Sequence, residues 1–433
     1  MKTVIMAGGK GTRMASLAPG VPKPMIPVCG KPVLQYQLEC LARNKLTDII
    51  ISIGYLGDQI KNFCGDGKQF GCNISYYEEE EPLGSGGVLF KIIEDLDDDF
   101  ILINGDVIFD MDFSRFIDFY RSTGAWTALA VHPNSHPFDS ALLFTDSEHR
   151  VIKWLNKEEP RHYYKNQVNA GIHILSKKLL RAVKPVSEKV DLDRDILKPL
   201  IPSGKIFAYP TPEYIKDAGT PDRFAQVSED IKNGLVQRRN LSLKQKAVFL
   251  DRDGTINRLN GFISRPEDLI LLDGAAQGIK EVNRLGYLAI VVTNQPIIAR
   301  GEASLETLEE IHNKMETELG NYGAYLDDIF FCPHHPDKGF PGERPEYKID
   351  CSCRKPKPGM FFTASEKFNI DLGQSYMAGD DKRDIEAALN AGCRPVFIGA
   401  PSELQLIQES TGIKNILCFR NLARFAESLQ TLS

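Results

Sequence analysis

Residues 6–13 of this 433-residue chain read Met-Ala-Gly-Gly-Lys-Gly-Thr-Arg, and residues 249–255 read Phe-Leu-Asp-Arg-Asp-Gly-Thr. Each stretch directly follows or includes the end of a short apolar run, so each is expected to form a loop at the carboxyl end of a β-strand. The glycines of the first loop allow backbone N–H groups to approach phosphate oxygens. The second loop places two carboxylates close together. The chain therefore carries two chemically different loops in similar structural settings.

Length and composition favour two domains of a soluble, globular protein. A chain of 433 residues is too long for one ordinary core, and 42% hydrophobic with 25% charged residues is a typical globular composition. The formal net charge of −6 gives no electrostatic reason to expect nucleic acid or a membrane as a partner. No signal-peptide or membrane-spanning pattern occurs, and most of the nine cysteines stand singly. We therefore expect reduced thiols and a cytoplasmic location.

Short apolar strands alternate with helical stretches along the whole chain, which predicts an α/β fold with largely parallel sheets. A polar, basic stretch at 236–245 lacks a strand or helix-face pattern and is interpreted as a linker between domains at 1–235 and 246–433. The expected strands are Thr3–Met6, Asp48–Ile53, Phe100–Ile103, Thr127–Val131, Gly171–Leu175, Ala247–Leu250, Tyr287–Val292, Asp328–Phe331, Ser375–Ala378 and Pro395–Ile398. The expected helices are Val33–Asn44, Gly86–Asp95, Asp222–Leu235 and Leu305–Leu319, the last with Ser304 as N-cap and Gly320 just past its end.

The first glycine loop is a weak signal alone, because it fits neither a Walker A loop nor a Gly-x-Gly-x-x-Gly loop. Taken singly, its glycines could merely turn the chain. Three further residues strengthen the hypothesis: Lys23 stands between prolines, Asp106 follows the expected strand at 100–103, and Asp217 offers a second carboxylate. Open α/β sheets bind ligands at such strand ends. Two aspartates and a magnesium ion suit nucleotidyl transfer, because the metal neutralises the phosphates that react and leave.

In order and spacing, residues 1–235 resemble the sugar-1-phosphate nucleotidylyltransferases of the glucose-1-phosphate thymidylyltransferase and mannose-1-phosphate guanylyltransferase type. The resemblance implies a doubly wound, Rossmann-like sheet. It also implies nucleotide binding by Gly8, Gly9, Gly11, Pro82 and Gly84, catalysis at the phosphates by Arg13 and Lys23, magnesium binding by Asp106 and Asp217, and sugar-phosphate contacts by Lys157 and Asn169. One departure is that Lys157 lies in Asn-Lys-Glu, where the family often has Glu-Lys-Pro.

Not every acidic residue near these motifs is expected to act. Asp110 and Asp112 are interpreted as part of a solvated loop beside Asp106. The run of glutamates at 78–81 is interpreted mostly as a solvated acidic turn.

Asp251 and Asp253 offer the chemistry of a phosphate-removing enzyme, since one carboxylate can attack phosphorus while the other handles the leaving group's proton. Later strand ends and loops supply hydrogen-bond donors, cations and a further carboxylate. This order resembles the haloacid-dehalogenase-like phosphatases over about residues 246–433. The resemblance implies a second doubly wound, Rossmannoid sheet, with Asp251 as nucleophile, Asp253 as general acid/base, Thr293, Asn294, Arg354 and Lys355 on the phosphate, and magnesium held by Asp251, the carbonyl of Asp253 and Asp380; Asp384 is interpreted as a second-layer or helix-start carboxylate.

A metal-ligand pattern follows in the same half of the chain, formed by Cys332, His334, Cys351 and Cys353. Three thiolates and one imidazole make a four-coordinate zinc site with no open position, so the site is expected to be structural. Free cytosolic cysteines are the alternative, which the paired Cys-x-His and Cys-x-Cys spacings disfavour. A zinc loop in this position resembles the heptose bisphosphate phosphatases and the similar histidinol phosphatases.

Together the two resemblances imply a reaction sequence. Removal of the 7-phosphate from D-glycero-D-manno-heptose 1,7-bisphosphate leaves a heptose 1-phosphate, which a guanylyltransferase joins to GMP from GTP. The expected small-molecule partners are therefore GTP and heptose phosphates, with magnesium at both sites and zinc in the loop. Three alternatives stay open: a transferase for another hexose with a generalist phosphatase, a histidinol-type phosphatase, or a binding protein with inactive sites. The base, the sugar and the oligomeric state, a homo-oligomer included, also stay open.

Overall fold

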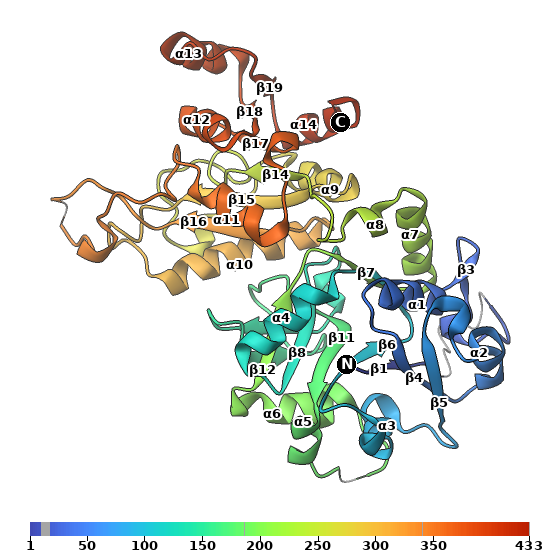
Figure 1. The fold of residues 1–433 in the computed structure, drawn as a ribbon. Helices are drawn as coiled ribbons and strands as arrows, with labels where there is room; N and C mark the ends of the chain where they lie inside the picture. The colour runs from blue at the N-terminus through green and yellow to red at the C-terminus, as the bar shows by residue number, and fades with distance from the viewer. Residues whose placement is uncertain (10–17, 186, 340, 433) are drawn as a thin grey trace. The chain divides into compact units, whose positions relative to one another are not determined.

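A computed structural model describes residues 1–433 except 10–17, 186, 340 and 433 (Figure 1). The chain divides into two compact units. The first unit comprises Met1–His132, Leu143–Leu155 and Val168–Ser242, and the second comprises Pro133–Leu142, Asn156–Gln167 and Leu243–Ser433. Two short segments of the N-terminal half therefore belong to the second unit, which no sequence pattern predicted. Within the described part of the chain, no helix is both long and apolar enough to cross a bilayer.

The described residues of the first unit form a nine-stranded mixed sheet, in which β1 lies between β4 and β6 and runs parallel to both. Strand β11 runs antiparallel to β6 on its other side, and a separate two-stranded ribbon joins β7 to β13. Met6 pairs with Asn104, so the loops that follow β1 and β6 leave the sheet side by side. The strands are β1 (Thr3–Met6), β4 (Asp48–Ile53), β5 (Asn73–Glu78), β6 (Asp99–Asn104), β7 (Val107–Asp110), β8 (Thr127–His132), β9 (Leu142–Thr145), β10 (Val151–Leu155), β11 (Val168–Ser176), β12 (Ile206–Pro210) and β13 (Tyr214–Asp217).

The second unit contains, among its described residues, a six-stranded parallel sheet in the order β16-β15-β14-β17-β18-β19. Leu250 at the end of β14 pairs with Val291 of β15 and Ala378 of β17, so the loops after these three strands meet at one edge of the sheet. The strands are β14 (Ala247–Leu250), β15 (Leu288–Asn294), β16 (Asp328–Cys332), β17 (Tyr376–Gly379), β18 (Arg394–Ile398) and β19 (Leu417–Phe419).

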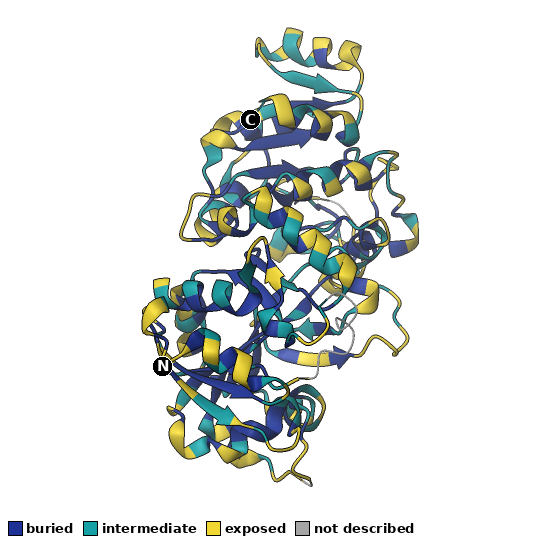
Figure 2. Ribbon diagram, turned by 90° about the vertical axis from the view of Figure 1, so that its right-hand side faces the viewer, coloured by how far each residue is buried: buried dark blue, intermediate teal, exposed yellow. Residues whose placement is uncertain are grey.

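Helices cover both faces of this parallel sheet, which explains why its strands are continuously apolar. Val248 and Leu250 of β14 share a core with side chains of α9, α10 and α14. Phe249 points to the opposite face and packs on Phe361 of α11, with ring centroids 4.8 Å apart. Figure 2 shows many of the strands as buried over most of their length. The principal helices are α1 (Val33–Arg43), α3 (Gly84–Lys91), α4 (Phe113–Thr123), α7 (Pro221–Lys232), α8 (Leu235–Arg238), α9 (Ala275–Arg284), α10 (Leu305–Asn321), α11 (Gly359–Phe368), α12 (Lys382–Ala391), α13 (Pro401–Thr411) and α14 (Leu422–Leu432).

The α/β class and every expected strand and helix occur, with ends that shift by a few residues. Two local expectations were wrong. The stretch at 236–245 is not without a helix, because α8 extends into it and Val236 packs in a core with Val28 and Val33. Gly320 does not lie past the end of α10 but inside it, where a side chain at this position would collide with the ring of Pro137.

Candidate functional site

A cavity of about 400 Å³ lies at the carboxyl ends of β1 and β6. The glycine loop after β1 and the small-residue loop that begins α3 both contribute to its wall. Six of the predicted residues line it, namely Gly8, Gly9, Lys23, Pro82, Gly84 and Asp106. Gly11 and Arg13, which were predicted to act here, lie outside the described residues.

Lys23 and Asp106 line this cavity, and the other predicted magnesium ligand, Asp217, lies near Lys23. The Lys23 ammonium forms an ion pair with the Asp106 carboxylate. Because β13 pairs with β7, the Ala218 N–H donates to the Asp106 carbonyl at 2.9 Å, which brings the end of β13 beside Asp106. Burial would raise the pKa of Asp217, but Arg223, 2.7 Å away, and Lys23 hold it below its usual range. Carboxylate oxygens such as those of Asp106 and Asp217 are ligands of the kind that magnesium prefers.

The Asn169 side chain on β11 is held by two hydrogen bonds from neighbouring residues. Its Oδ1 accepts from the Gly171 N–H at 3.1 Å and from His173 Nε2 at 3.0 Å. Burial lowers the pKa of His173 to about 4, so this imidazole stays neutral. Lys157 belongs instead to a segment of the second unit, where its side chain is 63% exposed and lies 3.8 Å from the Glu158 carboxylate. Its sugar-phosphate role stays a prediction.

Glu79 is a cavity residue that the sequence interpretation placed in a solvated turn. Its carboxylate lines the cavity and accepts hydrogen bonds from the Ser52 hydroxyl at 2.6 Å and the Leu83 N–H at 2.9 Å. A side chain at Gly8 would collide with it. The available signal was that Glu79 directly follows β5, at the same sheet edge as the glycine loop.

Asp110 was likewise wrongly assigned to a solvated loop. It ends β7, is only 5% exposed, and pairs with Arg43 at 2.7 Å and with the Asn240 amide at 2.6 Å. Asp112 caps α4, since its carboxylate accepts from the Ser114 N–H at 3.0 Å. Both residues therefore have structural partners, whereas the sequence had suggested a solvated loop.

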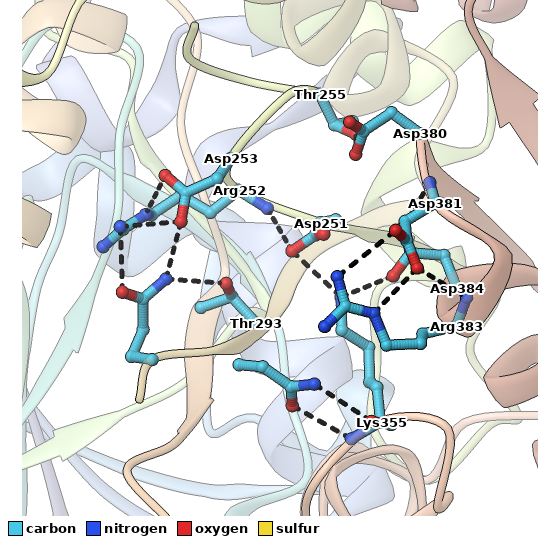
Figure 3. A network of polar contacts seen from close by, with 12 residues as sticks. Asp251, Arg252, Asp253, Thr255, Thr293, Lys355, Asp380, Asp381, Arg383 and Asp384 are labelled. Carbon is cyan, nitrogen blue, oxygen red and sulfur yellow. Dashed lines mark hydrogen bonds and ion pairs between the residues drawn. The ribbon is translucent and has the colours of Figure 1, made fainter. Parts of the chain in front are cut away.

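A second cavity, of about 200 Å³, lies at the carboxyl ends of β14, β15 and β17 (Figure 3). It is lined by all seven residues predicted for phosphate chemistry, and also by the Asp384 carboxylate. These residues are Asp251, Asp253, Thr293, Asn294, Arg354, Lys355, Asp380 and Asp384.

Lys355 is the buried cation of this cavity. Its Nζ lies 2.9 Å from Asp251 Oδ1 and 2.6 Å from Asp384 Oδ1, and its side chain is 2% exposed. Burial alone would lower the pKa of Lys355, but the two carboxylates raise it above its usual value, so the ammonium stays charged. Asp251 Oδ1 also accepts from the Arg252 N–H at 2.7 Å. The nucleophile predicted from the sequence is therefore fixed next to a permanent positive charge.

Asp251, Asp380 and Asp384 form a carboxylate group that fits a divalent cation. Their nearest oxygens lie within 4.8 Å of one another. Burial and the neighbouring Asp251 and Asp384 charges raise the pKa of Asp380 to about 7. Gly254 has φ +85°, and a side chain at position 254 would collide with the Asp380 carboxylate. Crowded, repelling carboxylates of this kind are stabilised by magnesium, and Asp384 joins the group although the sequence suggested only a second-layer or helix-start role.

Two of the predicted phosphate ligands have defined partners within the protein. Both amide atoms of Asn294 bind the backbone of Lys355, with Nδ2 3.0 Å from the carbonyl oxygen and Oδ1 2.9 Å from the N–H nitrogen. Asn294 thus positions Lys355, and the predicted phosphate contact through its amide is not supported. Arg354 donates to the His334 carbonyl at 3.0 Å while it lines the cavity.

The predicted zinc ligands come together at the end of β16 and in the loop before α11. Cys351 Sγ lies 3.4 Å from Cys332 Sγ and 3.2 Å from Cys353 Sγ, and His334 Nδ1 lies 3.5 Å from Cys353 Sγ. A hydrogen bond from Cys332 lowers the pKa of the Cys353 thiol to about 5. Ligands of tetrahedral zinc, with Zn–S of about 2.3 Å, lie a little under 4 Å apart, so these four donors fit the ion. The neighbouring His335 is not part of the group.

Comparison with known proteins identifies both halves of the chain. The family model described as Nucleotidyl transferase matches residues 2–234, more than half of the chain, and the HAD-hydrolase-like model matches residues 352–404. Over 151 residues the chain is 42% identical to D-glycero-beta-D-manno-heptose-1,7-bisphosphate 7-phosphatase of Haemophilus ducreyi, which covers 35% of this chain and 80% of that protein. The chain belongs to the nucleotidyl transferase family and to the HAD-like phosphatases. We refer to its two parts as the transferase unit and the phosphatase unit.

Two further relatives concern the transferase. The chain is 32% identical over 235 residues to mannose-1-phosphate guanylyltransferase of Mycobacterium tuberculosis, across 54% of this chain and 65% of that protein. The solved structure of HddC from Yersinia pseudotuberculosis is 28% identical, covers 53% of this chain and 99% of that chain, and has a TM-score of 0.46. The protein is thus an enzyme with a nucleotidyltransferase and a phosphatase in one chain, which confirms the two sequence resemblances.

Proposed function

We propose that this enzyme removes the 7-phosphate from D-glycero-D-manno-heptose 1,7-bisphosphate and then transfers GMP from GTP to the resulting heptose 1-phosphate. The observation that carries the proposal is the union of these two families in one chain. One set of relatives is named for a heptose bisphosphate, and another relative for guanylyl transfer to a sugar 1-phosphate. Removal of the 7-phosphate leaves the 1-phosphate intact, and a sugar 1-phosphate is the acceptor that such a transferase needs.

The phosphatase reaction uses Asp251 and Asp253 in two steps. An Asp251 oxygen attacks phosphorus, the bond from phosphorus to the sugar oxygen breaks, and that oxygen takes a proton from Asp253. Water then attacks the aspartyl phosphate, gives its proton to Asp253, and releases inorganic phosphate. The Lys355 ammonium, fixed 2.9 Å from Asp251, offsets the negative charge that builds up when two anions meet.

Magnesium would be held here by Asp251, Asp380 and Asp384, together with the carbonyl of Asp253. When bound, the ion would supply positive charge that offsets the negative charge of the nucleophile and the phosphoryl group. Asp384 already neutralises part of Lys355, at 2.6 Å, so the protein alone leaves a net negative site that favours a cation.

In the transferase unit, the phosphate oxygen of the sugar 1-phosphate attacks the α-phosphorus of GTP and pyrophosphate leaves. Gly8 and Gly9 line the cavity, and backbone N–H groups of such a glycine loop suit phosphate oxygens. Lys23 supplies positive charge at the same cavity, and Asp106 and Asp217 would hold magnesium. The ion supplies charge neutralisation for the α-phosphate and the leaving pyrophosphate.

One zinc ion would bind Cys332, His334, Cys351 and Cys353, with no open position and hence a structural role. Cys353 directly precedes Arg354 and Lys355, so a clamped loop fixes the two cations that face the phosphate. None of the nine cysteines, all of them in the described part of the chain, forms a disulfide, which supports a reducing compartment such as the cytoplasm.

The substrate test is a matrix of kcat/KM values. Heptose 1-phosphate, as each anomer, is paired with GTP, ATP, UTP, CTP and dTTP, and mannose 1-phosphate and glucose 1-phosphate are paired with the best nucleotide. We expect GTP and the heptose to give the highest value, with about tenfold to hundredfold preference, since one missing buried hydrogen bond costs about 1–3 kcal/mol. A preference for another nucleotide or for a hexose would overturn the substrate assignment and leave both reaction types intact.

A further inference from the structure

The Asp253 carboxylate is surrounded by hydrogen-bond donors on both oxygens. Oδ1 accepts from Arg252 Nε at 3.1 Å and Asn257 Nδ2 at 2.9 Å. Oδ2 accepts from Arg252 Nη2 at 2.8 Å and Gln295 Nε2 at 2.9 Å. In Figure 3 Asp253 turns toward Arg252, whereas Asp380 and Asp384 lie on the other side of Asp251. A carboxylate has about four lone-pair positions, so this one is fully used.

The donors around Asp253 differ in whether they have a second acceptor when their hydrogen bond to Asp253 breaks. The Gln295 amide has a second acceptor in the Thr293 hydroxyl at 2.9 Å, and the Asn257 amide has one in the Arg258 carbonyl at 3.0 Å. A general acid needs one oxygen free to carry its proton to the leaving group. Either amide can release that oxygen without losing all its hydrogen bonds. The paired Arg252 contacts then keep the carboxyl group in place.

Arg252 is itself held from behind by a histidine. Its side chain is fully buried, and Nη1 lies 3.4 Å from His312 Nε2. A guanidinium only donates, so His312 Nε2 must be the unprotonated acceptor. The other groups that face His312 are Lys165 and the ring of Phe331, whose centroid is 5.7 Å away. A buried guanidinium needs partners for its donors, and His312 supplies one on the side away from Asp253.

Neither Arg252 nor His312 lines the phosphatase cavity. His312 lies on α10 and borders a separate cavity of about 300 Å³, together with Glu309 and Glu316. The Arg252 side chain therefore reaches the cavity through its contacts with Asp253, and also through Gln295, whose Oε1 accepts from Arg252 Nη2 at 2.9 Å.

We propose that Arg252 and His312 are positioning residues for proton transfer: His312 orients the guanidinium, and the guanidinium aims the Asp253 carboxyl group at the leaving oxygen. The inference rests on the role of Asp253 in the proposed function. An aspartate without this two-point contact can rotate among its side-chain rotamers, and proton transfer requires hydrogen-bond distance to the leaving oxygen. The step itself is unchanged: Asp253 loses one proton, and the departing sugar oxygen gains it.

The test compares two leaving groups in the full-length enzyme. The leaving group of heptose 1,7-bisphosphate is a sugar alkoxide, which needs a proton. The leaving group of p-nitrophenyl phosphate is a stable phenolate, which does not. His312→Leu removes the acceptor, and His312→Gln keeps one in its side-chain carbonyl. Glu309→Gln is the matched control, since Glu309 borders the same cavity without a recorded contact to Arg252. Unchanged turnover of p-nitrophenyl phosphate in each variant reports that the phosphatase unit is folded.

For His312→Leu we expect kcat on the bisphosphate to fall about tenfold or more, but by no more than the roughly 10²–10⁴-fold that a general acid contributes. KM and the rate on p-nitrophenyl phosphate should change less than about twofold, and His312→Gln should recover most of the loss. Equal losses on both substrates, or no loss on either, would overturn the proposal. Asp253→Asn tests the general-acid role separately from the positioning role. If this variant loses equal activity on both substrates, Asp253 is not the general acid, and the positioning role of Arg252 and His312 fails as well. Arg252→Lys, which keeps the charge but not the paired contact, gives a second measurement should His312→Leu fail to fold.

Discussion

A lysine beside an aspartate at the end of a strand is the common residue-level feature of the two sites. Lys23 pairs with Asp106 after β6, and Lys355 pairs with Asp251 after β14. Both sites bind phosphates, so each site needs a cation to offset the negative charge of the substrate and of its own carboxylates. The Lys355 side chain is more deeply buried than that of Lys23, which strengthens its electrostatic effect.

Replacing Lys355 by methionine, which has a similar size but no charge, should therefore strongly lower the phosphatase activity. The variant leaves Asp251 and Asp384 without their shared cation and removes positive charge from the phosphate site. We expect kcat/KM for phosphate release to fall by at least about 10²-fold, as for other electrostatic contacts in active sites. Pyrophosphate release by the transferase unit, measured on the same preparation, should stay unchanged. A fall of less than about threefold would contradict the role given to Lys355.

Asp251 should carry the phosphoryl group covalently. In a single turnover in ¹⁸O-water, attack of labelled water on the aspartyl phosphate places label in inorganic phosphate if it attacks phosphorus, and in Asp251 if it attacks the acyl carbon. We expect fluoroberyllate to inhibit phosphate release by occupying Asp251 as an acyl-phosphate mimic. Trapping of a phosphorylated chain that the Asp251→Asn variant cannot form is the decisive measurement. Full activity in that variant would refute a carboxylate nucleophile.

Residues in contiguous motifs were predictable from the sequence, and residues defined by distant contacts were not. Asp251, Lys355 and Asp380 follow from motif order, and the structure places all three at one cavity. Glu79 could not be separated from its neighbours in an acidic run, because only its hydrogen bonds to Ser52 and Leu83 distinguish it.

At the scale of elements, the cysteine loop that leads into α11 is a second determinant of the phosphatase site. We expect about one zinc ion per chain, as four ligands without an open position imply. Cys351→Ser should lower the zinc content and the unfolding temperature of the phosphatase unit, because a structural metal contributes to folding itself. Metal analysis and thermal unfolding check both effects. Zinc-free protein with native stability would contradict the site.

Helix α10 gives a pH-dependent stability through Glu316. Burial raises the pKa of Glu316 from 4.5 to about 7, although its carboxylate accepts from the Asn166 N–H at 2.5 Å. As the pH rises through this window, the unfolded chain loses the proton before the folded chain does. Glu316 therefore lowers the free energy of unfolding progressively as the pH rises from about 4.5 to 7, and the whole penalty is present above pH 7.

Glu316→Gln removes this penalty and keeps an acceptor for Asn166. We expect the variant to be more stable than the natural chain at pH 8, by up to about 3 kcal/mol, and by much less at pH 5. Urea unfolding of the phosphatase unit at both pH values measures the difference. A difference that is the same at pH 5 and pH 8 would contradict the assignment.

Elements were predictable where the apolar pattern was strong and unpredictable where tertiary contacts decide. Buried strands such as β4 and β14 are continuous apolar runs, so their bounds match the expectation. Helix α8 has only a short polar sequence, and its burial depends on packing of Val236 against distant Val28 and Val33. Gly320 would end a helix by propensity, but α10 continues because glycine alone fits beside Pro137.

At the scale of the whole molecule, the two active-site cavities belong to separate compact units with separate cores. Sequence motifs predicted both chemistries, because each motif is local. They could not predict that Asn156–Gln167 joins the phosphatase unit. That assignment depends on contacts such as Asn166 with Glu316, which are 150 residues apart and leave no periodic pattern.

The most direct test of the account supplies only heptose 1,7-bisphosphate, GTP and magnesium to the full-length enzyme and measures GDP-heptose. We expect GDP-heptose, inorganic phosphate and pyrophosphate in equal amounts. Asp251→Asn should form no GDP-heptose until heptose 1-phosphate is added, whereas Asp106→Asn should release phosphate and accumulate heptose 1-phosphate. An active phosphatase and an active nucleotide site that together yield no GDP-heptose, even from added heptose 1-phosphate, would contradict the proposed two-step function.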